Sequence, residues 1–238
     1  MSYGGFPKYV SAAEKKEKAN GSIAKLKKKN PDIEPVIIEG RTLAKSWWGK
    51  AWNLNLESYA DYENRIARGK SYVRNNMVLD LKITKGKVMA KVQGSRSKPY
   101  DVEILIDALS NEKWEHVATL CNHSIDSLEQ LIEGKFPKKL EVLFKEKKYG
   151  IFPSPKEIHF DCSCPDWASM CKHVAAVLYG IGARLDSNPM FFFELRDIDS
   201  QELVRKSVEQ KLESMLKNVG KKSKREIAEK DISDIFGL

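Results

Sequence analysis

Cysteine is scarce in this chain, and long apolar runs are missing. Only 4 of its 238 residues are cysteine, which is too few for the disulfide framework of a small secreted domain. The longest apolar stretch, near Val174 to Ala183, is far too short to cross a bilayer. The first residues, Met1 to Phe6, contain no apolar core of a signal peptide. We therefore expect no membrane partner and a cytoplasmic location.

The sequence also lacks several motifs that identify enzymes. It contains no Gly-x-x-x-x-Gly-Lys-Ser/Thr phosphate-binding motif, no His-Glu-x-x-His zinc-protease motif and no nucleobase-deaminase pattern. A catalytic zinc site would in addition need an open coordination position for water. We therefore expect that the protein is not an enzyme and has no nucleotide-hydrolysing site of its own.

Positive charge is what the chain has in excess. Its formal net charge is +8 and its pI is near 9.1. This balance favours polyanionic partners such as nucleic acid, although many basic proteins bind none. Lysine is concentrated in the first 40 residues, where Ala12 to Lys29 indicates a mobile arm or an exposed helix that Asn30-Pro31 ends. The arm could contact phosphates or simply be a solvated charge run.

Three of the four cysteines and one of the four histidines lie within twelve positions, spaced C-x-C, six residues, C-x-H: Cys162, Cys164, Cys171 and His173. Four such ligands fill the tetrahedral shell that zinc prefers, so the spacing predicts a structural zinc site. The second pair opens a helix-like run, whose dipole should lower the pKa of Cys171. Buried free cysteines, a redox dithiol or a strained Cys162–Cys164 disulfide are weaker alternatives.

A second C-x-H pair, Cys121 and His123, precedes this stretch. It would have to borrow a C-x-C partner from the main cluster in order to bind a metal. We therefore expect a core cysteine beside a polar histidine at this place.

The Cys-Ser-Cys-Pro-Asp-Trp and Cys-Lys-His-Val-Ala-Ala-Val-Leu-Tyr segments resemble the SWIM zinc finger of stand-alone bacterial and archaeal proteins. The ligands of that family correspond here to Cys162, Cys164, Cys171 and His173. Segments within 42–52, 65–74, 92–96 and 99–100 resemble the N-terminal domain of the same proteins, so the resemblance covers residues from about 40 to about 196. It implies DNA binding, protein binding or both, and association with helicase-type ATPases of superfamily two.

The periodicities predict an α+β fold. Apolar residues at helical spacing indicate a tryptophan-rich helix that Thr42 could cap, and period-two alternation from Met77 to Ile106 indicates a three-stranded antiparallel meander covered by that helix. A helical middle, a strand–turn–helix zinc finger and a C-terminal amphipathic helix follow. The corresponding division is a basic arm, an α+β domain, a helical connector, the finger and a C-terminal helix with tail: 1–40, 41–110, 111–155, 156–196 and 197–238.

Cations near an aromatic residue form the best candidate nucleic-acid surface in the folded part, although a charged loop would look the same. The candidate contacts are Arg65, Arg68, Lys70, Arg74, Lys172 and Arg184. The tryptophans between 47 and 52 could be stacking platforms, but such a stripe is more often core. We expect an adaptor that binds DNA without sequence specificity and assists an ATPase. The alternative is a pure protein scaffold with structural zinc and no DNA contact.

Overall fold

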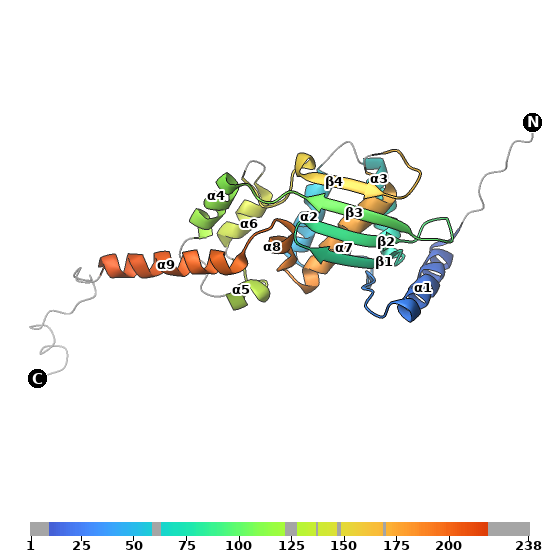
Figure 1. Cartoon of the computed structure of the whole chain (residues 1–238), viewed down its shortest axis with the longest axis horizontal. Helices are drawn as coiled ribbons and strands as arrows, with labels where there is room; N and C mark the ends of the chain where they lie inside the picture. The colour runs from blue at the N-terminus through green and yellow to red at the C-terminus, as the bar shows by residue number, and fades with distance from the viewer. Residues whose placement is uncertain are drawn as a thin grey trace, which may run out of the picture.

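The structure is a computed structural model that describes residues 10–58, 63–121, 128–136, 138–146, 149–168 and 170–218. It has the expected α+β fold, in which helices cover one face of an antiparallel sheet (Figure 1). None of the helices in these ranges is long and apolar enough to cross a membrane. In chain order the elements are α1 (Ala12–Lys29), α2 (Trp47–Glu57), α3 (Glu63–Arg74), β1 (Val78–Thr84), β2 (Lys87–Val92), β3 (Tyr100–Ile106), α4 (Asn111–Cys121), α5 (Leu128–Ile132), α6 (Lys138–Lys145), a 3-10 turn η2 (Pro155–Glu157), β4 (Ile158–Cys162), α7 (Lys172–Ser187), α8 (Phe191–Leu195) and α9 (Ser200–Asn218).

The sheet has four strands in the order β1-β2-β3-β4, all antiparallel to their neighbours. The first three strands are the predicted meander, and Gly86 makes the tight turn between β1 and β2 with a φ of 65°. The fourth strand comes from the predicted zinc finger and pairs with β3, so that Cys162 lies opposite Val102. The finger is therefore joined to the meander through backbone hydrogen bonds.

One irregularity in β1 divides the apolar residues of that strand between two cores. The register with β2 shifts between Val78 and Asp80, as happens when one strand carries an extra residue. Leu81 and Val78 remain in the main core, whereas Leu79 packs in a second, smaller core. Leu79 and Leu81 were expected to share a face, and alternation alone could not reveal the shift.

Helix α7 is the centre of the main core. It packs against all four strands on one side, and α2 and α3 pack against it. We expected the tryptophan helix to cover the sheet, but this place is taken by the helix that follows the cysteines. The approach of α3 is close, because a Cβ on Gly69 would lie 2.6 Å from the Cβ of Ala175.

The tryptophans of α2 are structural. Trp52 is 1% exposed, and its indole N–H donates to the Leu178 carbonyl of α7, while that of Trp48 donates to the Leu185 carbonyl. They are therefore core residues and not stacking platforms. The helix begins at Trp47 with Ser46 as its cap, later than expected for a cap at Thr42.

Asp186 explains where α2 begins. Its carboxylate accepts hydrogen bonds from the backbone N–H groups of Lys45 and Ser46 and from the Ser46 hydroxyl. Both Thr42 and Ser46 are acceptable capping residues, and a residue about 140 positions later decides between them.

The basic N-terminal segment contains a docked helix. Helix α1 begins with a capping box between Ser11 and Glu14, and its buried residues Ala19 and Ile23 pack with Leu79 in the smaller core. The described part of the arm is therefore a packed element, and several of its lysines remain exposed.

The β2–β3 loop is attached to α1. The Lys18 ammonium donates to the backbone carbonyls of Gly94, Ser95 and Arg96 at 3.1–3.4 Å. The Ser22 hydroxyl donates to the Gln93 side chain. The first helix thus fixes a loop that, as described below, packs against the metal-ligand cluster.

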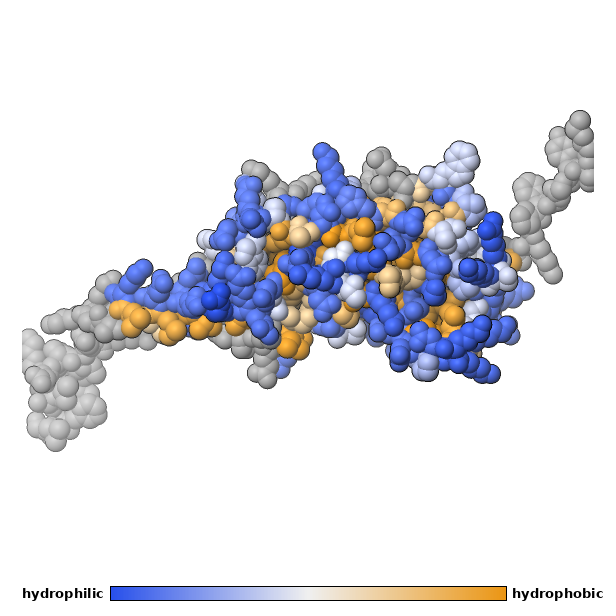
Figure 2. Space-filling view, viewed as in Figure 1, coloured by the Kyte–Doolittle hydropathy of each residue, from blue (hydrophilic) through white to orange (hydrophobic). Residues whose placement is uncertain are grey.

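Near the C-terminus, the short helix α8 packs on the core and α9 is the expected amphipathic helix. Phe192 and Phe193 are buried among aromatic side chains of the helical middle, and Phe191 is half-buried against the same core. Helix α9 lies within the segment 197–238 where an amphipathic helix was expected, and it extends away from the body of the molecule (Figure 1). The distal half of α9 exposes an apolar stripe (Figure 2): Leu212, Met215 and Leu216.

Candidate metal centre

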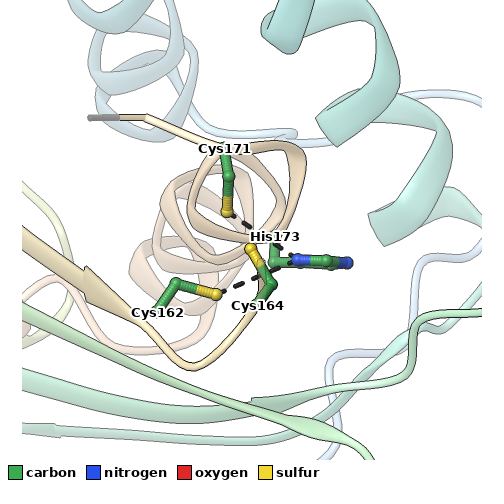
Figure 3. Close-up of side chains that lie close together, drawn as sticks. All are labelled: Cys162, Cys164, Cys171 and His173. Atoms are coloured by element: carbon green, nitrogen blue, oxygen red, sulfur yellow. Dashed lines mark hydrogen bonds between the residues drawn. The ribbon is translucent and has the colours of Figure 1, made fainter. Parts of the chain in front are cut away.

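The four predicted ligands lie at the junction of β4 and α7. Cys162 is the last residue of β4, and hydrogen bonds between Ser163 and Asp101 keep the chain beside β3 as it leaves the strand. Cys171 is the N-cap of α7 and His173 lies in the first turn of that helix. The loop between them therefore returns the chain so that both pairs face each other (Figure 3).

The geometry of the cluster fits one tetrahedral metal ion. The three sulfur atoms and a ring nitrogen all lie within 4.8 Å of one another. The His173 Nδ1 is 3.9 Å from the Cys162 sulfur and 3.7 Å from the Cys171 sulfur. A zinc ion with ordinary Zn–S and Zn–N bonds would give an edge of about 3.6 Å between such atoms. Three thiols and one imidazole form a donor set suited to zinc, so the residues present could hold a metal ion of this kind.

The electrostatics of the cluster favour thiolate formation at Cys171. The hydrogen bond between the Cys162 and Cys171 sulfur atoms lowers the pKa of Cys171 to about 3 despite its burial, and contacts with His173 and the Val174 N–H add to the effect. The same sulfur–sulfur bond raises the pKa of Cys162, and burial raises the pKa of Cys164. The expected lowering at Cys171 is confirmed in direction, although its neighbour Cys162 contributes more than the helix end.

His173 is held in place by residues of α3, the β2–β3 loop and the start of β3. Its ring packs 4.5 Å from the ring of Tyr100 and 5.4 Å from that of Tyr72. Its Nδ1 faces the sulfur atoms, and its buried Nε2 has no hydrogen-bond partner within the described part of the chain. A Cβ on Gly94 would lie 2.3 Å from the Tyr100 ring and 3.2 Å from this Nε2, so only glycine leaves room at that position.

Sequence reasoning did not assign these supporting residues to the site. Gly94 and Tyr100 lie in segments that carried the SWIM resemblance, and this was the signal that could have pointed to them. In the structure Tyr100 packs against the imidazole ring of His173, and Gly94 lies next to its Nε2, which faces away from the cysteines.

The loop between the two ligand pairs is fixed by a bidentate ion pair. The guanidinium of Arg65, on α3, contacts the two carboxylate oxygens of Asp166 at 2.9 and 3.1 Å. Asp166 also accepts a hydrogen bond from the Ala168 N–H. Arg65 was expected to contact nucleic acid, and here its guanidinium is engaged by the loop.

The other expected nucleic-acid contacts divide into two groups. Lys70 pairs with Glu57, the Arg74 Nε donates to the Arg41 carbonyl, and Arg184 binds Glu34. Arg184 is also eleven residues beyond His173 on α7, or roughly 17 Å along the helix. Arg68 and Lys172 form no ion pair with any described residue. Arg68 lies one turn before Tyr72 on α3, and Lys172 stands between Cys171 and His173 in the chain.

Two earlier hypotheses concern residues beyond the described ranges. His123 and the side chain of Cys121 lie outside them, so the second C-x-H pair stays a prediction. The predicted tail after position 218 also lies outside them.

Comparison with known proteins gives one relative and no function. The chain is similar to uncharacterized protein Rv2102 of Mycobacterium tuberculosis, with 34% identity over 183 residues. The aligned part is 73% of this chain and 66% of the relative, so the chain spans just under two thirds of the relative's length. No protein-family model matches the chain, and no solved structure matches it.

Proposed function

We propose that the cluster holds a structural zinc ion and that the protein is not an enzyme. Four protein donors are available for a tetrahedral ion, which would leave no coordination position for water or substrate. Cys171 and His173 are each 1% exposed, so two of the four donors are screened from solvent. This donor set is the observation that carries the proposal, and metal analysis of the purified native protein tests it.

We further propose that the protein is an adaptor that binds DNA without sequence specificity. The support is the net charge of +8 together with Arg68 on α3 and Lys172 at the start of α7, which pair with no carboxylate in the described part of the chain. From the SWIM resemblance we further expect that the adaptor assists a helicase-type ATPase. Contacts of this kind are made to phosphates and do not read bases.

Binding to a mixed-sequence DNA should weaken steeply with salt. If about three phosphates are neutralised, affinity should fall roughly 50-fold between 50 and 200 mM salt. Arg68→Ala should reduce the salt slope by about one phosphate contact. The matched control is Arg205→Ala, because Arg205 lies on α9 and pairs within its own helix with Glu209. Fluorescence anisotropy over a salt series measures both quantities.

The result that contradicts DNA binding is simple to recognise. Undetectable binding at low ionic strength, or binding that does not change with salt, would remove the proposal. If the slope of log affinity against log salt falls equally in the Arg68 and Arg205 variants, Arg68 does not contact DNA specifically.

The scaffold alternative is favoured by the apolar stripe on α9. Leu212, Met215 and Leu216 are more than half exposed on one helix, which is typical of a surface that meets another protein. Under this alternative, Leu212→Glu/Leu216→Glu should abolish co-purification of a helicase-type ATPase in nuclease-treated extracts. Retention of the ATPase by that double variant would reject the stripe as the contact.

A further inference from the structure

Trp167 is placed on the surface in an unusual way. Its side chain is 99% exposed, although tryptophan is on average among the more buried residues. The tryptophans of α2 show the ordinary behaviour, since Trp52 is 1% exposed. Exposure of so large an apolar group costs free energy in water, and nothing in the packing of the described chain requires it.

The segment that carries Trp167 is held at several points. Cys164 and Cys171 of the ligand cluster flank it. Asp166, the preceding residue, is gripped by both nitrogens of Arg65 and accepts a hydrogen bond from the Ala168 N–H. The backbone on either side of the indole is therefore held at Asp166 and Ala168, which reduces the conformational entropy lost when the indole binds a ligand.

Two cations lie on elements adjoining the loop, Arg68 on α3, whose Arg65 binds Asp166, and Lys172 at the start of α7. Arg68 and Lys172 have no carboxylate partner among the described residues, and the adjacent Asp166 is already neutralised by Arg65. On the other side of His173, Arg96 lies over the Tyr100 ring at 6.0 Å. These cations are suited to contact the phosphates of a polyanion that reaches the indole.

The surface lacks the apolar extent of a protein-docking site. Among the described residues of the loop between Cys164 and Cys171, Trp167 is the one large apolar side chain that is exposed. The other exposed large apolar side chains of the described chain lie on α2, α5, α6, α9, the sheet face and the N-terminal segments. Neither α3 nor α7 contributes one within its described residues. A protein hot spot would be a packed apolar cluster with a polar rim, whereas a single aromatic group among cations is the arrangement that binds unpaired nucleic acid.

We propose that Trp167 stacks on an unpaired base of single-stranded DNA, while Arg68 and Lys172 contact the neighbouring phosphates. This inference rests on the proposed DNA binding and narrows its substrate, because a base inside a duplex has both faces covered by its neighbours. Stacking needs only the face of a base, so it agrees with binding that ignores sequence.

The experiment compares two oligomers of equal charge in anisotropy titrations with the full-length, metal-loaded protein. One is a thymidine oligomer of about 15 nucleotides, and the other is an abasic chain of the same length. We expect the wild type to prefer the thymidine oligomer about 10-fold, and Trp167→Ala to lose about 10-fold in affinity for it with little change for the abasic chain. Trp167→Phe should retain most of the preference. Met89→Ala, on the open sheet face and about half exposed, is the matched control and should behave as wild type.

Intrinsic fluorescence gives an independent reading. Stacking should quench the wild-type signal when the thymidine oligomer is added, and the quench should be missing in Trp167→Phe. A uridine oligomer in parallel shows whether the same stacking also serves RNA, and a blunt duplex should bind more weakly than the single strand.

The outcomes separate this inference from the function on which it rests. If the wild type binds neither oligomer at low salt, both fail. If the wild type binds but Trp167→Ala binds equally well, or loses affinity equally for both oligomers, stacking is overturned and DNA binding stands. Loss of a co-purified protein with unchanged oligomer binding would instead make Trp167 a protein contact. The metal content of each variant shows whether the loop is intact. If Trp167→Ala does not hold the metal, the test uses Trp167→Phe, which must keep the preference for the thymidine oligomer and lose the fluorescence quench.

Discussion

Replacing Cys171 with Ser is expected to abolish stoichiometric metal binding and to lower the melting temperature by roughly 15 °C. Apparent binding free energies of structural zinc are about 10–16 kcal/mol in isolated fingers. Here a large hydrophobic core also stabilises the fold, so we expect the free energy of unfolding to fall by only about 5 kcal/mol. Each kcal/mol corresponds to about 2–4 °C in melting temperature for a chain of this size. Elemental analysis and thermal unfolding measure the two effects.

The same change, or a chelator, should first raise hydrogen exchange in the residues between the ligand pairs. If the finger over 156–196 were an independent unit, metal loss would damage all of it before the N-terminal layer. The structure sharpens this expectation, because α7 packs on all four strands and cannot leave without opening the main core. Exchange should therefore rise at the end of β4 and the first turn of α7, while the buried half of α7 follows only at global unfolding.

The control is Cys121→Ser, which removes a cysteine outside the cluster. It should keep one metal ion per chain and thereby also test the second C-x-H pair. Full metal content in Cys171→Ser, or unchanged exchange around Cys162 after metal removal, would contradict the assignment of the site.

Replacing Arg196 with Met should lower the free energy of unfolding by about 3 kcal/mol. The Arg196 side chain is 2% exposed, contacts a Glu157 oxygen at 2.6 Å and donates to the Asp107 carbonyl at 2.8 Å. Breaking a buried pair leaves an uncompensated charge, which typically costs about 3–5 kcal/mol, and here Lys113 retains part of the compensation. Urea unfolding measures the change.

The double variant Arg196→Met/Glu157→Gln separates charge from packing. It should lose less than the sum of the two single variants, with a coupling of about 1–3 kcal/mol. Arg205→Met removes an exposed partner of Glu209 on α9 and should change stability by less than about 0.5 kcal/mol. Strict additivity of the two buried variants would show that the pair is not coupled.

The pair of Arg196 with Glu157 also predicts how the free energy of unfolding depends on pH. Burial acts to raise the pKa of Glu157, but hydrogen bonds from Arg196, Ser154 and Lys113 outweigh it and lower the pKa from 4.5 to about 2. A lowered pKa in the folded state stabilises the protein above the unfolded value. The contribution, about 2 kcal/mol after allowance for solvent screening, should be complete above pH 5 and be lost as pH falls from about 4.5 through 2. The difference between wild-type and Glu157→Gln profiles isolates it from protonation of the metal ligands.

The ligand cluster was predictable because its spacing is a local property of the chain. Cys162 and His173 are eleven residues apart, and a strand, a turn and a capped helix suffice to bring them together. The meander was predictable for the same reason, since period-two alternation and a glycine turn determine neighbouring strands.

What the sequence could not provide was the set of contacts between distant segments. Three such contacts join residues more than fifty positions apart: the strand pairing of Cys162 with Val102, the ion pair of Arg65 with Asp166 and the packing of Tyr100 on His173. The beginning of α2 depends on a distant carboxylate as well. Cationic residues look alike in a sequence. Only these contacts distinguish the guanidinium of Arg65, which binds Asp166, from that of Arg68, which pairs with no carboxylate among the described residues.

The late position of α7 in the chain has a consequence for biosynthesis. The last strand of the meander ends 66 residues before α7 begins. Until α7 is made, the sheet lacks the helix that covers its apolar face, and until β4 is made, β3 has an unpaired edge. Nascent chains in this interval expose surface of the kind that chaperones bind. Chains truncated before residue 187 should therefore aggregate during translation, and the arrival of a metal ion at Cys171 would coincide with the closing of the core.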